Sequence, residues 1–304
     1  MMVSVVIVSW NTKVLLMRCL ESIFTFPPDI GVEVFVVDNA SSDGSAEMVR
    51  QSFPQVGLIE NQENIGFARA NNQALRRCRG DALMLLNPDT ELKAGAFQAM
   101  VAFMQENPRA GATGPFVLNP DGTLQHSCSP APTLFRETLR LLHLPGMRPD
   151  GYYPMEKWDQ TIPRQVDILL GACILLRREA FDQIGLLDED YFIYSEEVDL
   201  CSRLKKSGWE LYWVPASQVI HYGGQSTQQV AQEMFLRLYE NKLKYFRKQH
   251  GGLEAKIYKF LLGFVSVIRL SLVPFALLEG PAQRQQHLKQ ADNYRRLLTA
   301  LPGM

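Results

Sequence analysis

The sequence predicts an α/β fold, in which helices flank a mixed, mainly parallel sheet and a helical tail follows at the C-terminal end. Three apolar runs support this prediction, at residues 3–9, 32–38 and 81–89. Each run is long enough for a buried strand, and each ends on polar residues. Stretches with helical spacing or helix-starting residues lie between and after the runs. Such alternation is typical of parallel strands whose connecting helices cover the sheet.

The first 125 residues predict the order strand, helix, strand, short helix, weak strand, helix, strand, helix. These elements are expected at residues 3–9, 15–23, 32–38, just after 41–44, at 56–60, from Asn64, at 81–89 and at 94–107. The strand at 32–38 ends on Asp38, and the Ser-Ser-Asp-Gly sequence after it supplies turn and helix-capping residues.

The second half of the chain is less regular. It predicts a turn or hairpin, a long excursion rich in proline and aromatic residues, a strand interrupted by a glycine, a helix, a further strand and a last helix. These features are expected at 119–122, 127–163, 166–176 with Gly171, 196–207 ended by Gly208, 209–215 and 228–249.

Composition narrows the classes of protein. Lys and Arg number 31 against 32 Asp and Glu, so the net charge of −1 gives no basic field for nucleic acid. The five cysteines contain no C-x-x-C pair, which argues against a disulfide framework and a cysteine-rich zinc site. The first residues lack the pattern of a secretory signal, so we expect a cytoplasmic protein.

A composition break at His250-Gly251-Gly252 predicts a domain boundary. We expect one domain over 1–250, with halves at 1–125 and 126–250, followed by a helical tail over 251–304. The tail from Glu254 carries a charge of +4, whereas the residues before it carry −5.

Polar residues follow three of the predicted strands. They are Ser9-Trp10-Asn11, Asp38-Asn39 and Asn87-Pro88-Asp89. Because ligands bind beyond the carboxyl ends of strands in open α/β sheets, these tips predict a pocket rather than three unrelated turns. The glycine-rich G-x-G-x-x-G and G-x-x-x-x-G-K-[ST] phosphate loops are absent from the sequence. A nucleotide in the pocket would therefore be held by side chains and a metal.

Asp89 is the candidate metal ligand, because Mg²⁺ and Mn²⁺ prefer oxygen ligands and can bridge a diphosphate. His221, before two glycines, is a candidate second ligand, and an ordinary loop or core histidine is the alternative. The acids Glu196, Glu197 and Asp199 form a further cluster. At helical spacing Asp199 can pair with Arg203, which leaves Glu197 without an obvious partner.

The motifs IVSWN, VVDNASSDGS, NIGFARANN, LLNPDT, LLGACILLRREAF, YSEEVDLCSRLKKSGW and HYGGQS occur in this order over residues 3–249. In combination they resemble family 2 glycosyltransferases with the GT-A fold, and most closely the rhamnosyltransferase-like branch. The resemblance makes 1–125 the nucleotide-sugar-binding half and 126–250 the acceptor and catalytic half.

The resemblance implies a role for each motif. Ser9, Trp10, Asn11 and Asp38 would bind the nucleoside, and Asn64, Gly66, Phe67, Arg69 and Asn72 would lie beside the nucleotide and its phosphates. Asn87 and Asp89 stand at the D-x-D metal motif, with Asn87 in place of the first acid, and His221 would complete a Mg²⁺ or Mn²⁺ site. Glu197 would be the general base, beside Glu196, with Gly171 and Ala172 lining the acceptor pocket.

The activity implied is inverting transfer of a sugar, with rhamnose as a candidate, from a nucleoside diphosphate sugar to a hydroxyl. The acceptor would be a glycan or a lipid-linked glycan in cell-surface polysaccharide assembly. Two alternatives stay open at this point: a sugar nucleotidyltransferase, and a non-catalytic nucleotide-binding or scaffold subunit.

The tail contains long apolar stretches over 257–278, interrupted by Lys259, Arg269 and Pro274. They are too short for a spanning helix, which needs about 20 apolar residues. On a helical wheel a basic and small-residue side faces away from the apolar residues; its members are Lys256, Lys259, Gly263, Ser266 and Arg269. This pattern is typical of a helix at a membrane surface, and the lipid-linked acceptor that the resemblance implies favours peripheral contact through 256–278 with the cytoplasmic face of the inner membrane. The alternative is packing on the protein itself or on a second copy in a homo-oligomer.

Overall fold

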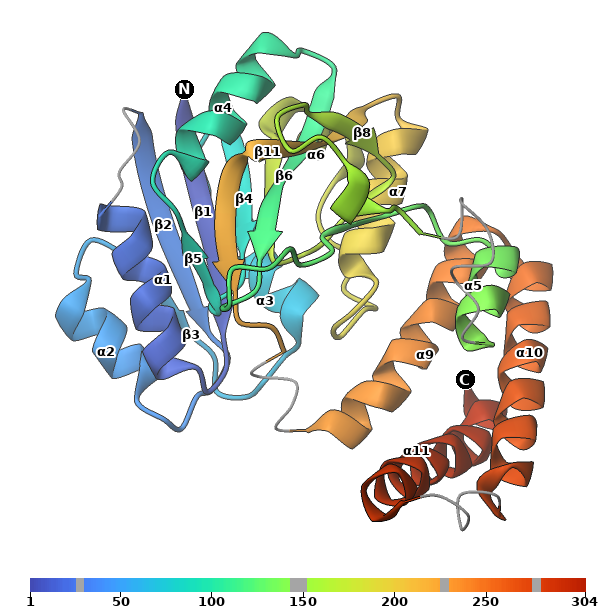
Figure 1. Ribbon diagram of the computed structural model, residues 1–304. Coiled ribbons are helices and arrows are strands. Elements are labelled where there is room, and N and C mark those ends of the chain that lie inside the picture. Colours follow the sequence, from blue (N-terminus) through green and yellow to red (C-terminus); the bar gives the residue numbers. More distant parts are fainter. Residues whose placement is uncertain (26–29, 143–151, 225–229, 275–279) are drawn as a thin grey trace. The chain divides into compact units, whose positions relative to one another are not determined.

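A computed structural model describes residues 1–25, 30–142, 152–224, 230–274 and 280–304 (Figure 1). The chain forms two compact units. We call Met1–Ala131 with Tyr153–Gln229 the sheet unit, and Pro132–Tyr152 with Val230–Met304 the helical unit. Each is described by itself.

The sheet unit contains a nine-stranded sheet in the order β3-β2-β1-β4-β10-β6-β11-β5, with β8 also paired to β11. Six of these strands run in one direction, and β5, β8 and β10 run in the other. The bounds are β1 Met2–Ser9, β2 Gly31–Asp38, β3 Gly57–Glu60, β4 Ala82–Leu86, β5 Thr90–Leu92, β6 Ala110–Leu118, β8 Arg164–Val166, β10 Cys173–Arg177 and β11 Glu210–His221. A small second sheet pairs β7 Cys128–Ser129 with β9 Ile168–Leu169. The predicted mixed, mainly parallel sheet is confirmed.

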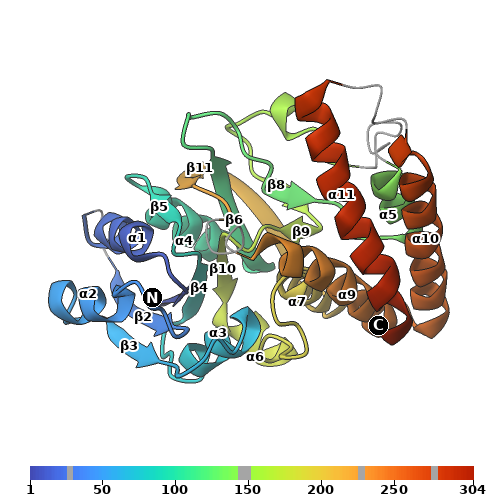
Figure 2. The same cartoon turned by 90° about the horizontal axis from the view of Figure 1, so that it is seen from below.

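Helices cover both faces of the large sheet (Figures 1 and 2). Alternate residues of β1 point to opposite faces, so Val5 and Ile7 belong to one core and Val6 and Val8 to the other. The first core includes residues of α1 Lys13–Thr25, α2 Ser45–Ser52 and α4 Ala96–Glu106. The second includes residues of α3 Phe67–Leu75, α6 Arg178–Ile184 and α7 Glu196–Lys206.

The strand register brings the predicted polar tips to one edge. Ser9 at the end of β1 pairs with Asp38 at the end of β2, and β4 pairs with the other side of β1, with Leu86 opposite Ile7. Asn87 follows β4 directly. The tips of β1, β2 and β4 are therefore neighbours at the carboxyl edge of the sheet.

Two strands differ from expectation. Strand β6 was not predicted, because Gly111, Gly114 and Pro115 interrupt its apolar pattern. A Cβ at Gly111 would lie 2.7 Å from the Trp209 side chain, and one at Gly114 would lie 2.8 Å from Leu169, so glycine permits this close packing. Strand β11 continues to His221 rather than ending at 215, with a register shift between Val214 and Gln218.

The predicted hairpin at 119–122 is confirmed. The backbone N–H of Asn119 donates to the carbonyl of Thr123 at 2.8 Å, and Gly122 donates back to Asn119 at 2.9 Å. Leu118 and Leu124 form an antiparallel bridge beside the turn. The backbone N–H of Gln125 then donates to Val117, which fixes Gln125 alongside β6.

The helical unit consists of α5 Leu134–Leu141, α9 Ala231–Gln249, α10 Gly252–Ser271, α11 Pro281–Ala300 and the short η4 Leu301–Gly303. Phe246, Tyr258 and Leu262 are buried between these helices. Buried Glu137 of α5 accepts from Lys242 at 2.6 Å and from Arg140 at 2.5 Å. Burial opposes ionisation of Glu137, but these two cations outweigh it and lower its pKa. Helix α9 therefore groups with the C-terminal helices, whereas we had expected the boundary after residue 250.

The predicted basic side of the tail is only partly exposed. Lys259 donates to the carbonyls of Pro302 and Met304, and Arg269 donates to Leu141 and lies over the Tyr294 ring. Both cations are thus used within the helical unit. In the described part of the chain, no helix combines the length and apolarity needed to cross a bilayer. Residues 275–278 of the predicted contact segment lie outside the described residues.

Candidate functional site

Asp38 presents an unpaired carboxylate oxygen at the sheet edge. Its Oδ2 accepts from the backbone N–H of Ser41 at 2.9 Å, while its buried Oδ1 has no hydrogen-bond partner. Asn11 adopts φ 53°, and its Oδ1 accepts from the backbone of Ser42 at 2.8 Å, which ties the β1 loop to the β2 loop. Ser9 is buried and bonds Thr12 at 2.9 Å. Asp38 Oδ1 is therefore an unused acceptor, as the expected contact of Asp38 with a base or ribose requires.

The segment over residues 64–67 acts as a support for a later loop. Asn64 Oδ1 accepts from Asn39 at 2.8 Å and from the backbone N–H of Gly66 at 3.1 Å. Gly66 has φ 88°, and a Cβ there would lie 2.7 Å from the Phe192 carbonyl oxygen. The N–H of Phe67 donates to the same carbonyl at 2.6 Å. The glycine thus permits the loop around Phe192 to dock on the start of α3.

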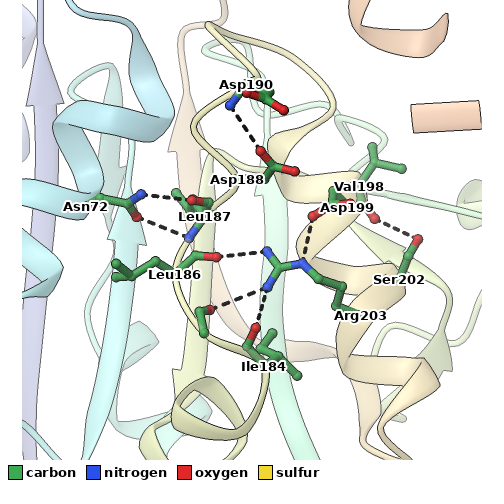
Figure 3. Close-up of polar contacts among 11 residues, drawn as sticks. Asn72, Ile184, Leu186, Leu187, Asp188, Asp190, Val198, Asp199, Ser202 and Arg203 are labelled. Carbon is green, nitrogen blue, oxygen red and sulfur yellow. Dashed lines mark hydrogen bonds and ion pairs between the residues drawn. The ribbon is translucent and has the colours of Figure 1, made fainter. Parts of the chain in front are cut away.

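Asn72 and Arg69 of α3 also meet this later loop. Asn72 is fully buried, and its amide both donates to and accepts from the backbone of Leu187, at 2.8 and 3.1 Å (Figure 3). Exposed Arg69 lies 3.9 Å from Glu189 in an ion pair. In the structure, Asn72 makes a positioning contact with Leu187. The expected place of Asn72 beside the nucleotide stays a prediction, and so does that of Arg69.

The Asn-Pro-Asp turn after β4 is fixed by the strand next to it. The backbone N–H of Asn87 donates to the Ala172 carbonyl at 2.9 Å, and buried Thr90 donates its hydroxyl to the same carbonyl at 3.4 Å. Asp89 sits between these anchors and is itself buried. The carbonyl of Asp89 accepts from the backbone N–H of Tyr222 at 2.9 Å, which brings the end of β11 to the turn.

His221 faces Asp89 at this point, with 3.3 Å between Nε2 and Oδ1. Its other ring nitrogen, Nδ1, lies 2.6 Å from Gln125 Oε1. The Gln125 amide nitrogen donates to Asn119 Oδ1 and to the His221 carbonyl, so its oxygen is the atom that faces the ring. Nδ1 therefore carries a proton, and in the neutral ring the buried Nε2, which has no hydrogen-bond partner, presents a lone pair.

A lone pair beside a carboxylate oxygen is an arrangement that a cation stabilises, so the donor set fits a divalent metal. Asp89 supplies the hard oxygen and His221 the nitrogen, and Gln125 orients the histidine from behind. No group of three or more His, Cys, Asp or Glu forms a metal cage among the described residues. Two protein ligands would leave coordination positions for water and for phosphate oxygens of a ligand.

The acid pair begins α7, after two strained residues. Tyr194 and Ser195 have φ of 67° and 72°, a conformation that is uncommon for residues other than glycine. Glu196 is only 5% exposed, whereas Glu197 is partly exposed. Burial raises the pKa of both carboxyls, and the charge of Glu197 raises that of Glu196 further. One oxygen of each carboxyl is buried without a hydrogen-bond partner.

Glu197 lies beside the segment that holds the Asn-Pro-Asp turn. A Cβ built on Gly171 would be 3.6 Å from both Cβ and Cγ of Glu197, and the next residue, Ala172, accepts from Asn87. The Gly171–Ala172 segment thus lies between Glu197 and the Asn-Pro-Asp turn. The predicted pair between Asp199 and Arg203 is confirmed at 2.7 Å, and Arg203 also donates to the carbonyl of Ile184 (Figure 3).

A sequence profile described as glycosyl transferase family 2 matches residues 4–185. The chain belongs to glycosyltransferase family 2. Its fold is the GT-A fold, and the alternatives of a nucleotidyltransferase or a scaffold subunit are set aside. The motifs at the sheet edge are thus those of a glycosyl-transfer enzyme.

Three known proteins are similar to this glycosyltransferase. The N-acetylglucosaminyl-diphospho-decaprenol L-rhamnosyltransferase of Mycobacterium tuberculosis is 34% identical over 215 residues, covering 64% of this chain and 68% of that one. The low-salt glycan biosynthesis hexosyltransferase Agl10 of Haloferax volcanii is 27% identical, covering 62% and 58%. A mannosyltransferase of Pyrobaculum calidifontis, solved with GDP-Man and Mn²⁺, has a TM-score of 0.60 at 18% identity, covering 99% and 84%. This last likeness is one of fold.

Two positioning residues of the glycosyltransferase were not predicted from the sequence. The role of Gln125 could not be predicted, because the sequence around it shows only the preceding turn. Its contact with His221 joins residues 96 positions apart. Phe192, whose carbonyl accepts from the N–H of Phe67, was not singled out in the sequence. Of the HYGGQS motif, Gln225 and Ser226 lie outside the described residues.

Proposed function

We propose that this glycosyltransferase moves a sugar from a nucleoside diphosphate sugar to a hydroxyl of a lipid-linked glycan, with inversion at the anomeric carbon. The observation that carries the proposal is the approach of His221 Nε2 to Asp89 Oδ1 at 3.3 Å. It lies at the sheet edge that also presents the unpaired oxygen of Asp38. A nucleotide site and a cation site on one edge are what a diphosphate sugar requires.

Asp89 and His221 would hold a Mg²⁺ or Mn²⁺ ion, and the Mn²⁺ complex of the structurally similar mannosyltransferase supports this choice. When bound, the ion would neutralise the negative charge that grows on the leaving diphosphate. Gln125 keeps the His221 lone pair directed at the site, and the Ala172 carbonyl holds the Asn-Pro-Asp turn in place.

Glu197 would take the proton of the acceptor hydroxyl as that oxygen attacks the sugar. Glu197 as a residue is partly exposed whereas Glu196 is buried, and the Glu197 side chain lies beside Gly171, which is expected to line the acceptor pocket. The raised pKa makes Glu197 a stronger base than an exposed glutamate. A single base and direct displacement lead to an inverted product.

The relatives support rhamnose as the sugar and a lipid-linked diphosphate sugar as the acceptor. The mycobacterial relative is named for L-rhamnosyl transfer to N-acetylglucosaminyl-diphospho-decaprenol, and the match covers 68% of its length. We propose the same class of donor and acceptor here, with the enzyme on the cytoplasmic face of the membrane that holds the acceptor lipid.

The donor is tested by nucleoside diphosphate release from a panel of nucleotide sugars, with and without a lipid-diphosphate-linked N-acetylglucosamine acceptor. We expect acceptor-dependent release from a nucleoside diphosphate rhamnose. We also expect EDTA to abolish release and Mg²⁺ or Mn²⁺ to restore it. Full activity after exhaustive chelation would remove the metal from the proposal, and preference for another sugar would remove rhamnose.

The base is tested with Glu197→Gln, for which Glu196→Gln is the matched comparison. We expect Glu197→Gln to bind the donor normally and to lose turnover by about 10²–10⁴-fold. We expect Glu196→Gln to retain more turnover than Glu197→Gln. A near-normal rate in Glu197→Gln would transfer the role of base to Glu196 or to another acid.

A further inference from the structure

Helix α10 carries an exposed apolar surface that none of the described residues covers. We call it the α10 stripe; it consists of Leu253, Ile257, Phe260, Phe264, Val267, Ile268 and, at the C-cap, Leu272. These residues recur three or four apart, so they share one helix face. Phe260 is 71% exposed and Phe264 55%, with ring centroids 6.3 Å apart. The opposite face, with Tyr258 and Leu262, is buried in the helical unit.

Exposed apolar residues are concentrated on this unit. Of 14 exposed large apolar side chains in the described residues, 11 belong to the helical unit and seven of those form the α10 stripe. The three in the sheet unit are Met1, Val14 and Ile162, which lie far apart in the sequence. The sheet unit of a second copy therefore offers no comparable apolar surface for the stripe. A continuous exposed apolar stripe of this kind marks an interaction site.

The two units carry opposite net charges, and this difference indicates which kind of surface the helical unit binds. The helical unit has 15 Lys and Arg against 7 Asp and Glu, a net charge of +8, whereas the sheet unit has 16 against 25, a net charge of −9. Two helical units would repel each other, which disfavours pairing of two stripes. An anionic surface would attract the helical unit and repel the sheet unit.

Exposed cations lie next to the stripe itself. Lys256 is exposed, three residues after Leu253 and four before Phe260, so it flanks the stripe. Arg247 and Lys248 are exposed at the end of α9, where α10 begins. The one acidic residue of α10, Glu254, pairs with His250 at 3.1 Å. The flanking charge is therefore positive, supplied by Lys256 and the end of α9 rather than by Lys259 and Arg269.

We propose that the α10 stripe docks on the surface of an anionic lipid bilayer. The helix lies along the surface, with Phe260 and Phe264 inserted at the boundary between headgroups and acyl chains, and Lys256 near lipid phosphates. The inference extends the proposed function, because a lipid-linked acceptor would be met at that surface. Lipid binding itself requires neither donor nor acceptor.

The test is co-sedimentation of the full chain with vesicles of phosphatidylcholine, alone or mixed with phosphatidylglycerol, in the absence of substrates. We expect binding to the mixed vesicles, and a loss of at least about tenfold in Phe260→Gln/Phe264→Gln, because two inserted aromatic side chains are removed. The matched control is Val14→Gln/Ile162→Gln, which changes exposed apolar residues of the sheet unit and should bind as the wild type does. All four side chains are exposed, so the variants should fold.

A second variant tests charge. Lys256→Glu should weaken binding to the mixed vesicles by about fivefold or more and leave binding to phosphatidylcholine alone unchanged. Equal binding by the wild type and Phe260→Gln/Phe264→Gln would overturn the proposal. So would a wild-type dimer in sedimentation velocity that the same double variant converts to a monomer without any vesicle binding, because the occupant would then be a second copy. Failure of sugar transfer would leave these readouts unaffected.

Discussion

The unpaired buried atoms of Asp38, Glu196, Glu197 and His221 are the most informative residue-scale feature of this molecule. Each of these side chains has one buried oxygen or nitrogen without a hydrogen-bond partner. Folding rarely leaves such atoms unpaired, because each costs about 1–3 kcal/mol. Asp38 lies at the end of β2, and His221 lies at the end of β11. Glu197 lies beside Gly171, next to the segment that holds the Asn-Pro-Asp turn. Their place beside the proposed site is what we expect if groups of the substrates complete their hydrogen bonding.

The orientation of His221 should depend on Gln125. We expect Gln125→Leu to weaken Mn²⁺ binding by about 10–100-fold, because the Nδ1 proton then loses its acceptor and Nε2 no longer holds a fixed lone pair. Gln125→Glu keeps an acceptor oxygen, so its affinity for Mn²⁺ should lie between those of the wild type and Gln125→Leu. Titration of Mn²⁺ by electron paramagnetic resonance, with a nucleoside diphosphate present, measures this without turnover. Thr123→Val, in the same hairpin, is the control, and an equal loss there would assign the effect to the hairpin.

Glu196 should make stability depend on pH. Burial and the charge of Glu197 raise its pKa, so the folded state holds the proton more tightly than the unfolded state. Its contribution is fully present below the unfolded pKa, about 4.3, and is lost as pH rises through the folded pKa. We therefore expect Glu196→Gln to match the wild-type Tm in acid and to exceed it at pH values above neutrality. Exposed Glu63→Gln is the control. Parallel Tm curves for wild type and Glu196→Gln would contradict the assignment.

At the scale of elements, the position of Glu197 depends on the loop that precedes α7. The loop before α7 is held by Asn72 at Leu187 and by Phe67 at Phe192, and it ends in the strained pair Tyr194–Ser195. Arg203 fixes the start of the same connection through the carbonyls of Ile184 and Leu186. Contacts at both ends thus offset the backbone strain, so the position of Glu197 is set by residues that do no chemistry.

Gly66 should be the sensitive point of this loop. A Cβ there would meet the Phe192 carbonyl and ring at 2.7 Å, and φ is +88°. Gly122 has nearly the same φ, +83°, with nothing within 4 Å of the added Cβ. We expect Gly122→Ala to cost about 1 kcal/mol from backbone strain alone, and Gly66→Ala to cost more and to reduce turnover. Urea unfolding and turnover measure both variants, and equal costs would show that the contact with Phe192 is unimportant.

The sequence predicted those elements whose signal is local. Strands β1, β2 and β4 are continuous apolar runs, and their polar ends were expected at one edge because parallel strands place them there. Strand β6 was missed because its burial depends on Trp209 and Leu169, which come much later in the chain. Likewise, the contact of His221 with Gln125 and the place of Glu197 beside Gly171 arise from long-range packing. The sequence pattern alone therefore marked His221 and Glu197 as candidates, and their roles came from the family resemblance.

At the scale of the whole molecule, two units have separate cores. The sheet unit is built around the two faces of its sheet, and the helical unit around buried residues such as Phe246, Tyr258 and Leu262. The division also separates charge, with −9 in the first unit and +8 in the second. The proposed catalytic residues thus lie in the sheet unit and the proposed membrane-docking stripe in the helical unit.

Separate cores predict separate unfolding transitions. All four tryptophans, Trp10, Trp158, Trp209 and Trp213, belong to the sheet unit, so fluorescence reports that unit alone, whereas circular dichroism at the helical band reports both. Leu262 is 1% exposed in the helical unit, and Leu262→Ala should destabilise that unit by about 2–5 kcal/mol. We expect part of the dichroism transition to move to lower urea while the fluorescence midpoint stays unchanged. Leu83→Ala, in the sheet core, should move the fluorescence midpoint instead. A common shift of both signals in either variant would mean that the two units unfold as one.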